Sequence, residues 1–218
     1  MSIFNFFESK PLKEFTVEQM DRLKYKCRIA FVDDEEQPYV ERMQKDGYSI
    51  TPLEDIENID AFMHNQYQVV ILDIQGVGKK LSPNSEGWGV LKYIKNEYPH
   101  TIVIMYTGAD WSITKYQDLA SLADDFIGKD LEFLDFKTKI DAGIKKAFSF
   151  KYHYEIEKQV MKKEIADASS LQEIEDIVFK YGQDHDKVMR KINNKPKEVL
   201  LHVESFLSIA SNLIGLLV

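Results

Sequence analysis

The sequence predicts an α/β domain in which helices cover both faces of a five-stranded parallel sheet, followed by an all-helical C-terminal extension. Short apolar runs alternate with amphipathic helical patterns between residues 28 and about 148, as in consecutive β-α-β units. Four of these runs end on an acidic, hydroxyl or amine side chain. After residue 149 only helical periodicity remains. These observations predict an α/β domain at 27–149, a helical extension at 150–218 and a partly helical leader at 1–26.

The strand candidates are short runs of mainly apolar residues. They lie at Ile29–Val32, Tyr48–Pro52, Gln68–Leu72, Thr101–Tyr106 and Asp125–Gly128. Runs of this length, bounded by turn residues, are typical of strands that are buried on both faces of a parallel sheet. Right-handed crossovers favour a doubly wound, flavodoxin-like sheet with the strand order 2-1-3-4-5.

The segments that follow the strand candidates carry apolar residues at helical spacing. Helices are expected at Pro38–Asp46, Ile56–Asn65, Trp88–Tyr98, Trp111–Leu122 and Phe133–Phe148. Pro99 ends the third of these because proline cannot continue a helix. The stretch from Ile74 to Gly87 contains three glycines, one proline and two serines, which predicts a long loop.

Polar side chains suited to phosphate chemistry follow the strand candidates. They are Asp33, Asp34, Asp73, Thr107 and Lys129. Because ligands bind at the carboxyl ends of parallel strands, these side chains are expected to converge on one pocket. Three clustered carboxylates repel one another unless a cation joins them, and oxygen ligands suit Mg²⁺. An aspartate can also attack phosphorus and form an aspartyl phosphate.

Four motifs in this order carry a family resemblance. They are FVDDE at Phe31–Glu35, VILDI at Val70–Ile74, YTG at Tyr106–Gly108 and DFIGK at Asp125–Lys129. Each motif alone is common, but their joint order resembles a response-regulator receiver domain over about 120 of the 218 residues.

The resemblance implies a role for each residue. Asp73 is the implied phosphoacceptor, and Thr107 and Lys129 complete the catalytic set. The implied metal ligands are Asp33, Asp34, Asp73 and the backbone carbonyl of Gln75. The implied switch residues are Thr107 and Phe126. It also implies Mg²⁺ as cofactor and a phosphohistidine donor on a sensor histidine kinase or a phosphotransfer protein. Such a chain is not an enzyme for other substrates, because it catalyses only its own phosphorylation and dephosphorylation.

Two departures from the family pattern stand out. The loop after Asp73 is several residues longer than usual, and Lys79, Lys80 and Glu86 within it are candidates to reach the phosphate site. Asp130 follows Lys129 where the family typically has proline.

The sequence leaves other functions open. A receiver-like binding module without phosphoryl turnover is the main alternative, and a DNA-binding regulator is another. A haloacid-dehalogenase-type phosphatase uses similar residue types, but it has a second aspartate where this chain has Gln75. Phe126 is read as core packing as well as a switch residue, and His202 as a helix-surface residue rather than a phosphotransfer histidine.

Composition narrows the class of protein. A net charge of −8 argues against a nucleic-acid-binding surface. A single cysteine fits a reducing cytosol, and no uncharged run reaches the 18 residues of a membrane span, so a cytoplasmic protein is expected.

The helical extension offers a different surface. Residues 151–218 carry 10 Lys or Arg against 11 Asp or Glu, so no basic recognition helix is expected. Phe206–Val218 is almost wholly apolar, which predicts a packed helix, a homodimer or partner interface, or membrane contact. The expected output is contact with a downstream protein whose identity the sequence does not reveal.

Overall fold

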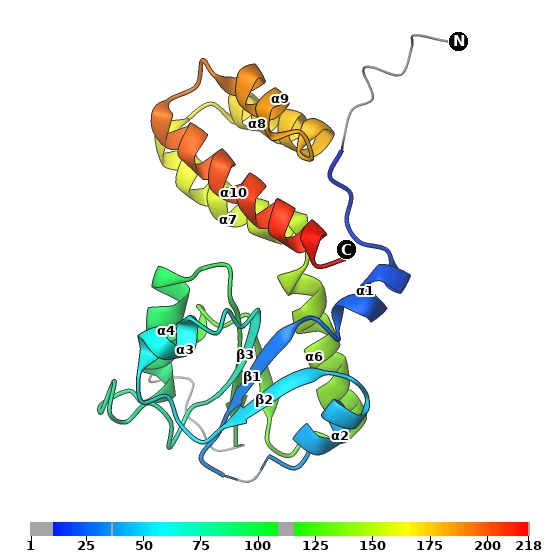
Figure 1. The fold of residues 1–218 in the computed structure, drawn as a ribbon. Helices are drawn as coiled ribbons and strands as arrows, with labels where there is room; N and C mark the ends of the chain where they lie inside the picture. Colours follow the sequence, from blue (N-terminus) through cyan, green and yellow to red (C-terminus); the bar gives the residue numbers. More distant parts are fainter. Residues whose placement is uncertain (1–10, 36, 109–115, 218) are drawn as a thin grey trace. The chain divides into compact units, whose positions relative to one another are not determined.

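The computed structural model describes residues 11–35, 37–108 and 116–217. The chain forms two compact units (Figure 1). One is an α/β unit at 17–147, and the other is a helical unit formed by 148–217 with residues 11–16 of the N-terminal segment.

The α/β unit is built on a single parallel sheet. Its strands are β1 (Arg28–Val32), β2 (Ser49–Leu53), β3 (Val69–Asp73), β4 (Ile102–Thr107) and β5 (Asp125–Gly128). They lie in the order β2-β1-β3-β4-β5, and every neighbouring pair is parallel. The fold class predicted from the sequence is therefore confirmed. The second strand lies one residue later than expected because Arg28 of β1 pairs with Ser49.

Helices precede, connect and follow the strands. They are α1 (Val17–Leu23), α2 (Val40–Lys45), α3 (Ile59–Met63), α4 (Gly87–Glu97), α5 (Gln117–Ala120) and α6 (Phe133–Ala147). The helix expected at Trp111–Leu122 is seen only as the short α5, and its beginning lies outside the described residues.

Each face of the sheet buries alternate strand residues. Val70 and Leu72 of β3 lie in an apolar cluster with α3 and α4, including the fully buried Trp88. On the other face α6 approaches the sheet closely at Gly143, where an added Cβ would lie 2.9 Å from Ile104. Figure 1 shows these two helical layers on opposite sides of the strands. The sheet is thus buried on both faces, as its uninterrupted apolar runs require.

The described part of the helical unit contains four helices. They are α7 (Phe150–Glu164), α8 (Ala168–Tyr181), α9 (His185–Ile192) and α10 (Lys197–Gly215). α7 lies beside α10, and α8 beside α9 (Figure 1). α7 begins as a separate helix because the Ser149 side chain accepts a hydrogen bond from the Tyr152 amide.

The apolar stretch near the C-terminus is packed within this unit. The buried side chains of α10 are Val199, Val203, Phe206, Leu207, Ala210 and Leu213. This confirms the packed-helix interpretation for the described part of the stretch. Within the described ranges, none of the helices combines the length and apolarity that crossing a bilayer requires.

Two carboxylates tie the helical unit together. The buried Glu157 of α7 accepts a hydrogen bond from Ser205 at 2.7 Å and lies 2.6 Å from Nδ1 of His202, both on α10. Glu14 accepts hydrogen bonds from the amides of Phe150 and Lys151 at the start of α7, at 3.2 and 2.8 Å. The contact of His202 with Glu157 therefore joins α10 to α7.

Candidate functional site

The acidic residues come from two neighbouring strands. β1 and β3 pair in register, with Val32 opposite Leu72, so the next residue of each chain segment is an aspartate. The amide of Asp33 still pairs with the carbonyl of Leu53 at 3.0 Å, and Asp73 is the last residue of β3. Both aspartates are buried, with exposed fractions of 1% and 3%. The central strands therefore place two carboxyl groups side by side at one edge of the sheet.

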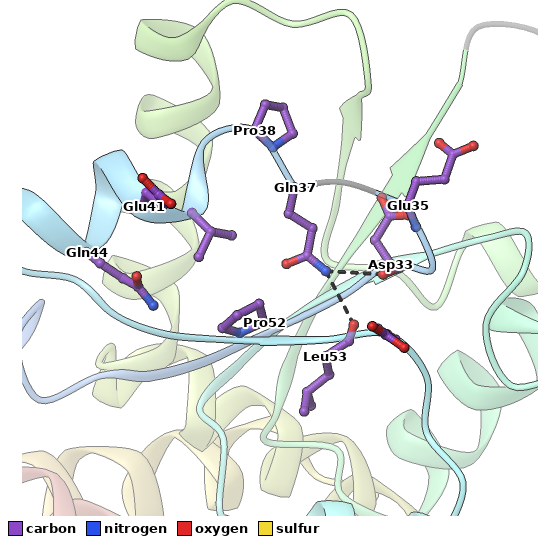
Figure 2. Close-up of a pocket in the computed structure, with 10 residues that line it drawn as sticks. Asp33, Glu35, Gln37, Pro38, Glu41, Gln44, Pro52 and Leu53 are labelled. Carbon is purple, nitrogen blue, oxygen red and sulfur yellow. Dashed lines mark hydrogen bonds between the residues drawn. The ribbon is translucent and has the colours of Figure 1, made fainter.

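The loop after β1 is held by side-chain hydrogen bonds. Oδ1 of Asp33 accepts from the amide of Glu35 at 2.9 Å, an arrangement typical of aspartate in turns. Nε2 of Gln37 donates to the carbonyls of Asp33 and Leu53 at 3.2 and 3.3 Å, as Figure 2 shows. These bonds join the loop to the end of β2 and fix the direction of Asp33.

An open cleft of about 620 Å³ lies beside this loop (Figure 2). It is lined by Asp33, Glu35, Gln37, Pro38, Val40, Glu41, Gln44, Pro52, Leu53 and Glu54. The acidic edge of the sheet is therefore open toward β2 and α2.

Lys129 brings a positive charge to the aspartates. It follows β5, and its amide donates to the carbonyl of Thr107 at 2.8 Å, which sets it beside the end of β4. Its Nζ lies 3.0 Å from Oδ2 of Asp73, 3.1 Å from Oδ2 of Asp33 and 3.2 Å from Oε2 of Glu35. One ammonium group thus contacts three carboxylates.

The donor set fits a divalent cation. Asp33, Asp34 and Asp73 each offer an oxygen, and these three atoms lie within 4.8 Å of one another. Oδ2 of Asp33 is buried and, among the described residues, accepts no hydrogen bond of good geometry, although it forms the ion pair with Lys129. Hard oxygen ligands of this kind suit Mg²⁺, with water completing its shell, and the buried Oδ2 of Asp33 has a lone pair available for it.

Burial and charge shift the ionisation of the site. Burial raises the pKa of Asp73 to about 6, and the neighbouring Asp33 carboxylate adds to this, while Lys129 opposes it. Burial by itself lowers the pKa of Lys129, but its bonds to Asp73 and Asp33 outweigh burial, so the pKa is raised overall. The lysine therefore stays charged, while the excess of negative charge at the aspartates is only partly compensated.

The long loop after β3 is ordered against the site. Gly87 at the start of α4 approaches the strand so closely that an added Cβ would lie 2.0 Å from the carbonyl oxygen of Asp73. The Gly76 amide donates to Oε2 of Glu86 at 2.6 Å. The exposed Lys80 pairs instead with Glu57, at the surface. Of the loop residues proposed to reach the site, Glu86 thus contacts the segment next to Asp73, while Lys80 has a different partner.

The remaining predicted residues lie around the cluster. Thr107 comes one residue after Tyr106, the partner of Asp73 in the β3–β4 register, and its hydroxyl donates to the carbonyl of Gly108 at 3.0 Å. Phe126 is half-buried and packs against Trp88, with ring centroids 6.2 Å apart. Gln75, two residues after the end of β3, is exposed. The packing of Phe126 supports its core role, whereas its role as a switch stays a prediction.

The sequence interpretation gave no role to Glu35 or Gly76. Glu35 lies two residues after Asp33, and its carboxylate reaches Lys129 across the rim of the site. Gly76 has a positive φ of +85°, and an added Cβ would lie 2.1 Å from Oδ2 of Asp34. The glycine-rich composition of the loop was the available signal, but it did not indicate which glycine contacts an aspartate.

The comparisons with known proteins concern the fold. No family model matches the sequence, and no curated protein matches it either. Several of the solved structures that the chain resembles are described as response-regulator receiver domains.

Three of these structures illustrate the likeness. The receiver domain of NtrX from Brucella abortus is 23% identical, with 53% of this chain and 97% of that chain covered and a TM-score of 0.45. A CheY-like receiver domain protein from Methanospirillum hungatei JF-1 is 22% identical, with 55% and 94% covered and a TM-score of 0.44. The beryllofluoride-activated NtrC4 receiver domain dimer is 20% identical, with 55% and 98% covered and a TM-score of 0.45. Each match spans nearly all of a receiver domain but about half of this chain.

Proposed function

We propose that the α/β unit is a phosphorylation-controlled receiver that accepts a phosphoryl group on Asp73. The observation that carries this proposal is the position of the Asp73 carboxylate. It lies 3.0 Å from the Lys129 ammonium and within 4.8 Å of two further carboxylates that suit a divalent cation. A nucleophile, a cation site and a fixed positive charge are the parts that phosphoryl transfer needs.

The proposed donor is a phosphohistidine of a sensor histidine kinase or a phosphotransfer protein. A carboxylate oxygen of Asp73 attacks phosphorus, the P–N bond breaks, and its electron pair returns to the imidazole nitrogen, which takes up a proton. Lys129 balances charge on the transferred group, and the Thr107 hydroxyl donates a hydrogen bond to a phosphoryl oxygen. When bound to Asp33, Asp34, Asp73 and the Gln75 carbonyl, Mg²⁺ supplies further neutralisation of the phosphoryl oxygens. Water later attacks phosphorus, the P–O bond to Asp73 breaks, and the free carboxylate and inorganic phosphate result. In this proposal the chain catalyses only its own phosphorylation and dephosphorylation.

Intact-mass measurement tests this proposal. The full chain is incubated with Mg²⁺ and acetyl phosphate, and one labile phosphoryl adduct is expected on the wild type. Asp73→Asn should carry no adduct, while Asp130→Asn, an exposed acid beyond the same edge of the sheet, should react normally. Absence of an adduct on the wild type favours the alternative of a binding module without turnover. An adduct that persists in Asp73→Asn assigns the reaction to another residue.

The helical unit is proposed as the output element. It follows α6, the last helix of the α/β unit, directly in the chain. The proposed output is contact of this unit with a downstream protein or with a second copy of the chain. Light scattering with and without a beryllofluoride phosphate mimic tests for a homodimer, and a mass that does not change with the mimic contradicts phosphate-controlled dimerisation.

A further inference from the structure

The peptide bond between Gln75 and Gly76 is held from its N–H side. The Gly76 amide donates to Oε2 of Glu86 at 2.6 Å, a short bond to a charged acceptor. None of the described peptide bonds is cis, and in a planar trans peptide the C=O points away from the N–H. The carbonyl oxygen of Gln75 therefore points away from the Glu86 carboxylate.

The same peptide lies close to the aspartate cluster. An added Cβ on Gly76 would lie 2.1 to 2.2 Å from both carboxylate oxygens of Asp34. Only a glycine with its positive φ of +85° lets the backbone come this near to the Asp34 side chain. Gly76 thus has Asp34 on one side and the Glu86 carboxylate on its amide.

Glu86 has an unusual backbone conformation. Its φ of +47° and ψ of −127° are rare for a residue with a side chain, because the Cβ makes such a conformation unfavourable. Glu86 precedes the first residue of α4, yet its side chain does not cap this helix. Its carboxylate is instead directed to the Gly76 amide, and its own amide donates to the carbonyl of Ser82 at 2.7 Å. Strain of this kind persists only where the surroundings enforce it, and it is common near functional sites.

We infer that Glu86 is a positioning residue for the metal site. Its carboxylate fixes the 75–76 peptide so that the Gln75 carbonyl is available as the backbone ligand of a divalent cation. The negative charge beside the N–H also polarises the peptide and strengthens its carbonyl oxygen as a ligand. This inference rests on the proposed function, because it assigns a supporting residue to the cation of that same site. Residues that hydrogen-bond to the ligands of a metal ion contribute strongly to the affinity for that ion.

Calorimetric titration of the metal-free full chain with Mg²⁺ tests the inference. Glu86→Ala removes the acceptor and is expected to weaken Mg²⁺ binding about tenfold or more. Glu86→Gln keeps an oxygen that accepts from Gly76, so it should restore most of the affinity that Glu86→Ala loses. Glu97→Gln, an exposed change at the other end of α4, should bind as the wild type does.

The outcomes separate this inference from the proposed function. If Asp34→Asn binds Mg²⁺ as tightly as the wild type, the proposed metal site itself is wrong. If Asp34→Asn weakens binding but Glu86→Ala does not, only the inference about Glu86 is wrong. Equal losses in Glu86→Gln and Glu86→Ala also overturn it, because the hydrogen bond then does not matter.

A purely structural role of Glu86 gives a different result. If Glu86 only stabilises the loop, metal-free Glu86→Ala melts at a lower temperature, while the folded variant binds Mg²⁺ as tightly as the wild type. That combination of results also refutes the inference. If Glu86→Ala does not fold, Glu86→Gly replaces it, since glycine adopts the positive φ without strain and also lacks the carboxylate. The loss of Mg²⁺ affinity expected for Glu86→Gly is the same.

Discussion

Replacing Asp73 by asparagine is expected to stabilise the metal-free protein. The carboxylate is 3% exposed and lies beside Asp33, and its pKa of about 6 means that ionisation is less favourable in the folded than in the unfolded chain. An amide of nearly the same shape has no charge to bury. Lys129 retains ion pairs with Asp33 and Glu35 in the variant, so the lysine is not left without an anion.

The pKa shift sets the size of the effect. A rise from 3.8 to about 6 corresponds to roughly 3 kcal/mol of unfavourable free energy when the carboxyl is ionised in both states. Relaxation of the site and the lost bond to Lys129 reduce this, so Asp73→Asn is expected to gain about 1–3 kcal/mol at pH 8. The folded state binds the proton more tightly, so the penalty is complete above pH 6 and fades as pH falls toward 3.8. The gain should therefore shrink between pH 8 and pH 4.5.

Urea denaturation in the presence of EDTA measures this gain. Both tryptophans, Trp88 and Trp111, belong to the sequence of the α/β unit, so their fluorescence follows the unfolding of that unit alone. Asp130→Asn, an exposed change next to Lys129, is the matched control and should leave the midpoint unchanged. A metal-free Asp73→Asn that is less stable than the wild type at pH 8 would refute the reasoning. So would a gain that does not depend on pH.

Three further changes probe other parts of the molecule. Asp124→Asn breaks the ion pair in which Nζ of Lys95 lies 2.9 Å from Oδ2 of Asp124. Burial raises the pKa of Asp124, but its ammonium and amide partners outweigh burial and lower the pKa overall. The variant should therefore lose about 2–3 kcal/mol of unfolding free energy at pH 7, measured by urea denaturation. That loss should narrow as pH falls below 3.8, since the wild-type stabilisation disappears when the carboxylate is protonated, and a constant loss would contradict the assignment. Gly87→Ala places a Cβ 2.0 Å from the last carbonyl oxygen of β3 and should lower the unfolding free energy by about 3 kcal/mol or more. Gly108→Ala, where no described atom lies within 4 Å, should lower it by less than about 1 kcal/mol. Similar melting temperatures for the two variants would be inconsistent with the close approach at Gly87. His202→Leu removes a partner of the buried Glu157 carboxylate on α7 and should destabilise the helical unit by about 1–3 kcal/mol. Far-UV circular dichroism measures the unfolding midpoint, and an unchanged midpoint would show that this contact is not stabilising.

The arrangement of the sheet was predictable because it depends on local properties of the sequence. The run at 69–72 is apolar without interruption, and it became β3, in which every residue is buried. The strand order was not fixed by the sequence in the same way. Right-handed crossovers leave a few possible orders, of which 2-1-3-4-5 is one, and the structure shows that order. The second strand was shifted by one residue because its ends are set by pairing with β1 rather than by its own composition.

The helical extension shows the limit of local patterns. The apolar stretch from Phe206 onward predicted a buried face, but the same pattern is compatible with a packed helix, a dimer or a membrane surface. The packed helix is identified only by the structure, in which α10 packs on α7 within the described residues. An apolar helix face requires a partner, and periodicity alone does not specify which partner it is.

The sequence by itself determined that three acids, a hydroxyl and an amine follow buried strands, and that parallel pairing gathers them at one edge. It did not determine the contacts within that edge. The contact of Lys129 with Glu35, the approach of Gly76 to Asp34 and the bond from Gly76 to Glu86 depend on how the segments after β1, β3 and β5 fold. Such contacts are set by long-range distances and by rare backbone angles, and residue type and spacing carry little information about either.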